Sequence, residues 1–292
     1  MTKAGLWLIC LAFAPVCLRA QVSVDVVFDE DQFLRGEAIK AAVRITNLSG
    51  RDLHLGGEED WLTFTVESRE GAVVSRLADV PVKGEFVLES ARRATKRVNL
   101  EPYFNFGRTG RYAVVANVRI KDWDQERKSE PKPFYVIEGA RLWEQDFGVP
   151  RLTGATNGPP EIRKYVLQQA NYRKDHLRLY LRVSDESGAH IIRTVPIGTI
   201  LSFSRPEPQI DKFSNLHIIY QSWARTFSYS VFTPDGELKT RETYDYVDTR
   251  PRLQVDSDGF ISVIGGVKRI APEESLPATS PQPATDLQAG HP

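Results

Sequence analysis

Hydrophobic and polar residues alternate with a period of two along residues 21–139. This alternation is typical of strands that bury one face and expose the other. Turn signals such as Ser49-Gly50 and Glu70-Gly71 separate the runs. About seven short strands with this spacing predict an all-β sandwich. The apolar members of successive runs are Val22, Val24, Val26 and Phe28, then Ile39, Ala41, Val43 and Ile45, then Leu62, Phe64 and Val66, then Phe86 and Leu88, Val98 and Leu100, and Phe134 and Val136.

One strand carries a more specific signal. Tyr112 follows the turn glycine Gly110 and opens a long alternating run. It resembles the tyrosine corner of immunoglobulin-like (Ig-like) sandwiches, whose hydroxyl bonds back to the preceding connection. Ala116 stands where such domains carry their second cysteine. We therefore expect the sandwich without its disulfide.

A wider set of features follows the same order. The residues concerned are Gly36-Glu37, Ile45 to Gly50, Phe64 to Gly71 and Gly110 to Tyr112. In this order the chain resembles exported bacterial Ig-like modules and, more loosely, the intracellular proteinase inhibitor family of bacilli. The resemblance implies an Ig-like β-sandwich over residues 21–139, and we carry over the fold but not the inhibition.

A connection is expected at residues 140–160, where glycine and proline are dense. Trp143 and Phe147 are unusual for a solvated linker. We expect these two aromatic side chains to pack against one or both neighbouring domains.

Residues 161–270 contain a repeat. Residues 205–211 match residues 250–256 at an offset of 45, and Gly188 and Gly236 align two further hairpins at an offset of 48. A period in the middle forties is typical of a propeller blade of four short strands. Too few units are present for a closed ring, so we expect an incomplete propeller-like domain or a plain antiparallel domain made by duplication. Its open strand edges would be covered by the sandwich, the linker aromatics or a second copy.

The sequences of the two ends predict segments that lie outside the folded domains. Residues 1–20 combine Lys3, an apolar run and a small residue at position 20, which predicts a secretory signal peptide. Val16 before Cys17 makes a lipoprotein the weaker alternative. The polar, proline-rich residues 271–292 predict a disordered tail. We expect an exported protein in the periplasm or outside the cell.

Cysteine content and charge balance limit the classes of protein to which this chain can belong. Both cysteines, Cys10 and Cys17, lie within it, so the mature chain has none. The full chain balances 38 basic against 38 acidic residues. This balance argues against a nucleic-acid partner, and no apolar run after the signal is long enough to span a membrane.

Few patterns in the sequence point to catalysis or metal binding. The five histidines and the acidic groups form no zinc or EF-hand motif, so we predict no metal and no cofactor. No nucleophile elbow or phosphate loop is present. Asp211 and Asp256 recur at equivalent repeat positions and are the candidate carboxylates for a glycosidase, although such recurrence is more typical of a turn. His217 is expected at the surface or at an interface, because it faces the opposite side from Leu216 and Ile218.

The remaining candidates are surface features. Trp123 and Trp223 lie in polar turns and are the candidate binding residues, because an exposed ring can stack on a sugar. The basic residues of 92–97 are expected on a sandwich edge, where charge opposes sheet-to-sheet pairing.

These observations favour a non-enzymatic exported protein that acts as a binding or structural module of the bacterial envelope or extracellular space. The first alternative is a carbohydrate-active or accessory protein that uses the second β domain. The second is a protease-inhibitor-like sandwich. We expect a protein or glycan partner, with self-association through open strand edges as a further alternative.

Overall fold

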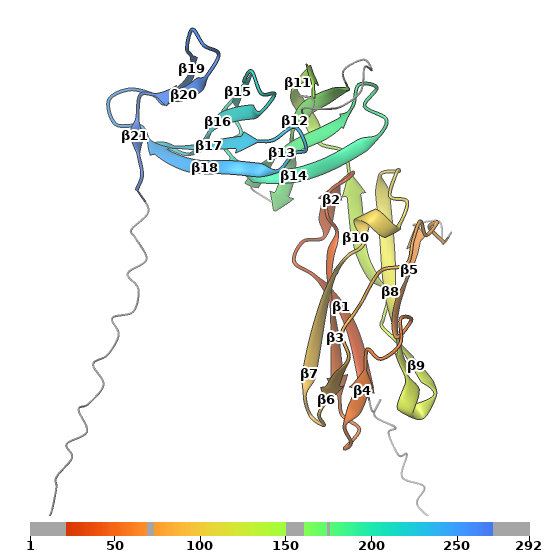
Figure 1. Ribbon diagram of the computed structural model, residues 1–292. Coiled ribbons are helices and arrows are strands. Elements are labelled where there is room, and N and C mark those ends of the chain that lie inside the picture. The colour runs from red at the N-terminus through yellow and green to blue at the C-terminus, as the bar shows by residue number, and fades with distance from the viewer. Residues whose placement is uncertain (1–21, 69–72, 150–160, 174–175, 271–292) are drawn as a thin grey trace, which may run out of the picture. The chain divides into compact units, whose positions relative to one another are not determined.

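The computed structural model describes residues 22–68, 73–149, 161–173 and 176–270 (Figure 1). Apart from two short 3₁₀ helices, η1 (Glu101–Tyr103) and η2 (Lys121–Trp123), the regular structure in these ranges is β-strand. The strands form several sheets, mostly antiparallel, and none closes on itself. The predicted all-β class is confirmed. The chain divides between Thr199 and Ile200 into two compact units.

Two sheets occupy the N-terminal part of the first unit. One has the order β1-β3-β7, with bounds Val22–Phe28, Lys40–Asn47 and Arg93–Asn99. The other has the order β2-β10-β8-β5, with bounds Gln32–Leu34, Lys132–Ile137, Gly110–Ile120 and Leu62–Ser68. β9 (Gln125–Lys128) pairs with the end of β8, and β4 (Leu53–Leu55) pairs with β6 (Phe86–Leu88). All these pairs are antiparallel except β2 with β10.

The alternating apolar positions of the sequence form a single core here. Side chains from both sheets belong to one hydrophobic cluster, in which Val43, Ile45 and Phe134 are fully enclosed. Burying each such side chain contributes on the order of 1.5–3 kcal/mol, so this face of each strand fixes the register. The hydroxyl of Tyr112 donates a 2.7 Å hydrogen bond to the carbonyl of Arg108. The bond predicted for this tyrosine is therefore confirmed.

The segment predicted as a linker begins as a strand. Ala140–Gly148 form β11, which pairs antiparallel with β12 (Ile162–Arg173). Phe147 is buried and stacks on Tyr165 with ring centroids 3.9 Å apart. The expectation that Phe147 packs is confirmed, and residues 140–148 belong to a sheet. Residues 150–160 lie outside the described residues, as do the predicted signal peptide and tail.

β11 and β12 belong to a four-stranded sheet with the order β11-β12-β13-β14, in which β13 is His176–Asp185 and β14 is Ile191–Ile200. This sheet lies in the first unit because it is bonded to the turns on either side of β2. Arg178 donates to both carboxylate oxygens of Glu30, at 2.8 and 2.9 Å. The amide of Thr194 donates to the carbonyl of Gly36 at 3.0 Å. The units therefore separate later in the chain than residues 140–160.

The second unit holds a five-stranded sheet and a hairpin. The sheet has the order β15-β16-β17-β18-β21, with bounds Glu207–Ile210, Leu216–Trp223, Thr226–Phe232, Leu238–Asp245 and Val267–Lys268. The hairpin consists of β19 (Arg252–Val255) and β20 (Ile261–Ile264). Ile219, Phe227 and Tyr229 of the sheet form a small core with Leu253 of the hairpin.

The match at offset 45 corresponds to two hairpins with the same turn. The Asp211 carboxylate accepts hydrogen bonds from the backbone N–H groups two and four residues further on, at 2.9 and 2.8 Å. Asp256 does the same at 3.0 and 2.8 Å. The third residue after each aspartate has positive φ, 62° at Ser214 and 78° at Gly259. The shared aspartate is thus explained by the geometry of the turn.

Candidate functional site

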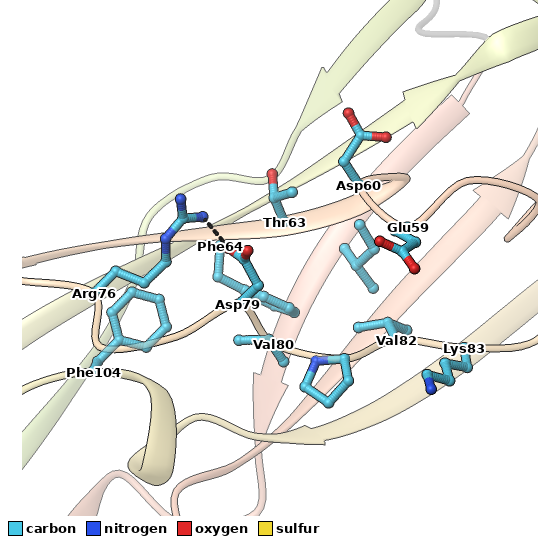
Figure 2. A pocket seen from close by; sticks show the side chains of 12 residues that line it. Glu59, Asp60, Thr63, Phe64, Arg76, Asp79, Val80, Val82, Lys83 and Phe104 are labelled. Carbon is cyan, nitrogen blue, oxygen red and sulfur yellow. Dashed lines mark ion pairs between the residues drawn. The ribbon is translucent and has the colours of Figure 1, made fainter.

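A pocket of about 480 Å³ lies along one side of β5, in the first unit (Figure 2). We call it the β5 groove. Its volume is in the range of sites that hold small molecules or short peptides. Its lining residues come from β5 and the preceding turn, from the segment that follows β5, and from the residue after η1: Glu59, Asp60, Leu62, Thr63, Phe64, Arg76, Asp79, Val80, Pro81, Val82, Lys83 and Phe104.

The floor of the groove is part of the protein core. Leu62, Phe64, Val82 and Phe104 are all buried members of the cluster between the two sheets. Leu62 and Phe64 alternate with Thr63, so the period of two that builds the strand also turns apolar side chains to the core. A floor anchored in this way is preformed, because moving it would disturb the core packing.

The backbone of β5 is open on the groove side. β5 is the last strand in its sheet and pairs only with β8 within the sheet. The carbonyl of Trp61 accepts a hydrogen bond from the amide of Arg119, so Trp61 points its backbone groups toward β8. In an antiparallel ladder the next residue points the other way. Leu62 and Phe64 therefore turn their N–H and C=O groups away from β8.

The hydrogen bonds of β8 support this direction of the Leu62 and Phe64 backbone groups. Ala116 lies opposite Phe64 in the register. The carbonyl of Ala116 accepts from the amide of Ser129, and its amide donates to the Ser129 hydroxyl. Both backbone groups of Ala116 are thus occupied on the side away from β5. Phe64 and Ala116 form a non-hydrogen-bonded pair, which leaves Phe64 facing the groove.

The far wall of the groove is the segment from Val74 to Val82. It leaves β5 at the ladder bond from the Val74 amide to the Val66 carbonyl at 2.8 Å. It returns at the start of β5, where the indole Nε1 of Trp61 donates to the Val82 carbonyl at 2.8 Å. The wall takes eight residue steps from Val74 to Val82, whereas the chain beside it takes five, from Val66 back to Trp61. In between, the wall pairs with the segment around Phe104 instead of with β5: the amide of Leu77 donates to the carbonyl of Tyr103 at 2.8 Å. Within the described part of the chain, no residue hydrogen-bonds to the outward backbone groups of Leu62 or Phe64.

Charged side chains of both signs stand at the rim. Arg76 and Asp79 form an ion pair at 3.0 Å, drawn as the dashed line in Figure 2. Glu59 and Lys83 lie toward the other end of the groove (Figure 2). The site therefore combines an apolar floor, an open strand edge and a polar rim, which together suit a ligand with a peptide backbone.

The two tryptophans singled out from the sequence lie in different surroundings. Trp223 ends β16, and its side chain is 65% exposed. The turn after it is held by Arg225, whose guanidinium donates to the carbonyls of Tyr246 and Val247. Trp123 ends η2 and is half-buried against the core of the first unit. Neither residue lines the β5 groove.

His217 is buried, so of the two positions expected for it the exposed surface is wrong. Its Nδ1 lies 2.7 Å from the Tyr229 hydroxyl and its Nε2 lies 3.2 Å from the Asp211 carboxylate. Burial lowers the pKa of His217, against the opposing effect of Asp211. Burial acts to raise the pKa of Asp211, but hydrogen bonds from Asn215 and His217 hold it below its usual value. This cluster fastens the turn to the neighbouring strands.

The basic segment 92–97 lies mostly on β7, an edge strand of the three-stranded sheet. The ammonium of Lys96 lies 4.5 Å from the ring centre of Phe86, within cation–π range. Charges on an edge strand oppose pairing with another sheet, as expected from the sequence. In the ranges that the structure describes, no group of three or more His, Cys, Asp or Glu side chains could hold a metal ion.

Sequence patterns did not locate the groove. Alternation identifies β5 as a strand, but its position at the edge of a sheet follows from pairing with β8, which lies far along the chain. The only local signal is the loss of regular alternation in residues 75–85 after a well-patterned strand.

The comparisons with known proteins add little to this geometry. No protein-family model matches the chain, and no curated protein matches it. The crystal structure of Spo0M, a sporulation control protein from Bacillus subtilis, is 11% identical and aligns over 61% of this chain and 90% of that chain, with a TM-score of 0.31. Similarity at that level supports no inference about this protein. No helix within the described ranges is long and apolar enough to cross a membrane.

Proposed function

We propose that this protein is an exported, non-enzymatic binding module of the bacterial envelope or extracellular space, and that the β5 groove is its binding site. The observation that carries the proposal is the open edge of β5 at the floor of a preformed apolar pocket. Export is supported by the charge, apolar run and cleavage position of residues 1–20.

The proposal includes an Ig-like sandwich as the scaffold of the groove. Three features support it: the division of the strands into β1-β3-β7 and β2-β10-β8-β5, the parallel pairing of β2 with β10, and the bond from Tyr112 to Arg108. Trp61 lies directly before β5 and is buried, as is the tryptophan typical of the third strand in such domains. A rigid scaffold of this kind suits a site that must be formed before the ligand arrives.

For the rest of the chain we propose an incomplete propeller-like repeat. The strands β11 to β14, and likewise β15 to β18, lie side by side in the order of the sequence. An offset of 48 residues relates the β13–β14 turn to the β17–β18 turn. An offset of 45 residues relates the β15–β16 turn to the β19–β20 turn. Both offsets therefore relate equivalent places in successive units.

Site-specific cross-linking tests the binding role. A photoreactive residue at Thr63, whose side chain lines the groove, is introduced into the mature protein and exposed to the envelope of the producing cells. The control carries the same residue at Thr95, on the edge strand β7. We expect a cross-linked species from position 63 that unlabelled mature protein competes away, and none from position 95. Equal labelling from the two positions, or none from either, would refute the proposal.

A glycan-binding role for the second unit is the second candidate function, and the exposure of Trp223 favours it. The hydrogen bonds of Arg225 hold the turn in place, so an indole on it can stack on a sugar ring with little loss of conformational entropy. Affinity for immobilised polysaccharides should then fall at least tenfold in Trp223→Ala and stay unchanged in Trp123→Ala. Retention of full polysaccharide affinity by Trp223→Ala would remove this candidate.

A further inference from the structure

We propose that the ligand of the β5 groove is an extended peptide segment of a partner protein, which adds to the sheet as a strand beside β5. This inference rests on the proposed binding role and specifies the chemistry of the partner.

The hydrogen-bonding groups of the groove have the spacing of a strand. Leu62 and Phe64 are 1% and 6% exposed, yet both direct their backbone N–H and C=O groups into the groove. Buried backbone groups are almost always paired, so in the free protein water must fill this role. The groups repeat every second residue, which is the period of an extended chain and of no compact small molecule.

Among the described residues, the outward edge of β5 is left unpaired between Trp61 and Val66, as an added strand requires. The ladder between β5 and its wall stops at the bond from Val74 to Val66 and is replaced by the indole bond of Trp61 at the other end. Between these two bonds the wall pairs with residues 103–105 instead of with β5. A chain placed there would lie about 4.8 Å from β5, the usual distance between paired strands. Since Val66 is already paired, the added ladder is short and centres on Leu62 and Phe64.

The floor selects the side chains of the occupant. Successive residues of a strand point to opposite faces, so alternate side chains of the added peptide turn toward Phe64, Val82 and Phe104. These positions favour apolar residues. The intervening side chains lie on the face of Thr63, which is partly exposed, and favour polar ones. The partner segment is therefore a short alternating stretch, such as an unpaired strand or a terminal extension. A second copy of this chain is the competing occupant.

Amide hydrogen exchange of the mature protein tests the open edge. The amides of Thr63 and Thr65 face β8 and serve as internal controls on the same strand. In the free protein we expect the amides of Leu62 and Phe64 to exchange at least tenfold faster than these controls, despite their burial. Equal protection of all four amides in the free protein would mean that the edge is already closed, and would overturn the inference.

A peptide ligand then tests strand addition. Ten-residue peptides that bind the mature protein are selected from a displayed library, and the tightest is synthesised with single N-methyl groups along its backbone. Methylation of the residues facing β5 should weaken binding by on the order of tenfold each, since one hydrogen bond is lost, and methylation of intervening residues far less. The bound peptide should slow exchange at Leu62 and Phe64. Thr63→Trp should abolish binding and Thr95→Trp should not.

The outcomes separate the two proposals. Cross-linking from position 63 without added protection at Leu62 and Phe64, or without alternation in the methylated series, would leave the binding role standing and overturn strand addition. Strand addition by a partner protein is also overturned if the free protein sediments as a dimer that Thr63→Trp converts to monomer, because the occupant is then a second copy. If no ligand is found whose binding depends on Thr63, both proposals are refuted.

Discussion

The indole Nε1 of Trp61 donates a 2.8 Å hydrogen bond to the main-chain carbonyl of Val82. Trp61 precedes the edge strand, and Val82 belongs to the irregular wall opposite. Both side chains are buried in the core of the first unit. This single bond fixes the far end of the wall to the sheet, and it closes the end of the groove nearest the start of β5.

We expect Trp61→Phe to destabilise the protein by about 1–3 kcal/mol, because the buried carbonyl of Val82 loses its donor. Amides of the wall near Val82 should exchange faster in the same variant. Urea unfolding followed by circular dichroism measures the first effect and hydrogen exchange the second. Trp223→Phe is the matched control, and it should stay within about 0.5 kcal/mol because Trp223 is exposed. Equal losses in the two variants would show that the indole bond is unimportant.

The hydroxyl of Tyr112 makes a comparable bond to the carbonyl of Arg108. Removing it in Tyr112→Phe should cost about 0.5–1.5 kcal/mol, the usual net value of one intramolecular hydrogen bond. The control is Tyr135→Phe, on the exposed side of β10. The urea midpoint of each variant, compared at an unchanged dependence of the unfolding free energy on urea concentration, measures both effects. A midpoint for Tyr112→Phe that matches the control would mean that the bond adds nothing to stability.

Local features of the fold could be predicted from the sequence, and features set by distant pairing could not. Val43 and Ile45 indicate a half-buried strand because alternation is a local pattern. Tyr112 indicates its bond because the acceptor lies only four residues away. The edge position of β5 depends on β8, so no local pattern contains it.

Tertiary packing decides the structure at two places where the local signal points elsewhere. Alternation assigned His217 to the surface or to an interface, but the run from Leu216 to Tyr220 is buried throughout, so both faces of β16 are covered. Glycine and proline at residues 140–160 suggested a connection, and Phe147, which was expected to pack, stacks on Tyr165 of β12 because residues 140–148 form a strand. In each case tertiary packing overrides a local signal.

The repeated aspartates provide a matched pair of variants. Asp211 and Asp256 accept the same two turn amides, but Asp211 also accepts from the side chains of Asn215, at 2.8 Å, and His217. Both alanine variants should destabilise the second unit, and Asp211→Ala should cost about 1–2 kcal/mol more, since it also leaves buried donors unpaired. Exchange of the β16 and β20 amides reports the two losses. A larger loss in Asp256→Ala would show that the additional partners of Asp211 do not stabilise its turn.

Glu37 lies in the turn between β2 and β3 and is 5% exposed. Its carboxylate accepts the amide of Leu34 at 2.8 Å. Burial raises the pKa of Glu37 to about 7, and nearby Glu30 adds to this, while the Leu34 amide and Arg178 act in the opposite direction. The ionised carboxylate is therefore unfavourable in the folded state.

The sign of the pH effect follows from this shift. Between pH 4.5, the ordinary value for the carboxyl, and about 7, the folded protein binds more protons than the unfolded chain, so stability falls as pH rises. A shift of this size corresponds to a loss of about 3 kcal/mol across that window, with no further change above it. Glu37→Gln, which cannot ionise, should remove this slope. Because burial lowers the pKa of His217, that residue gives an opposite slope in part of the window. The informative quantity is therefore the difference in unfolding free energy between the wild type and Glu37→Gln, measured by urea titration from pH 4.5 to 8. A constant difference across this range would show that Glu37 ionises as freely in the folded protein as in the unfolded chain.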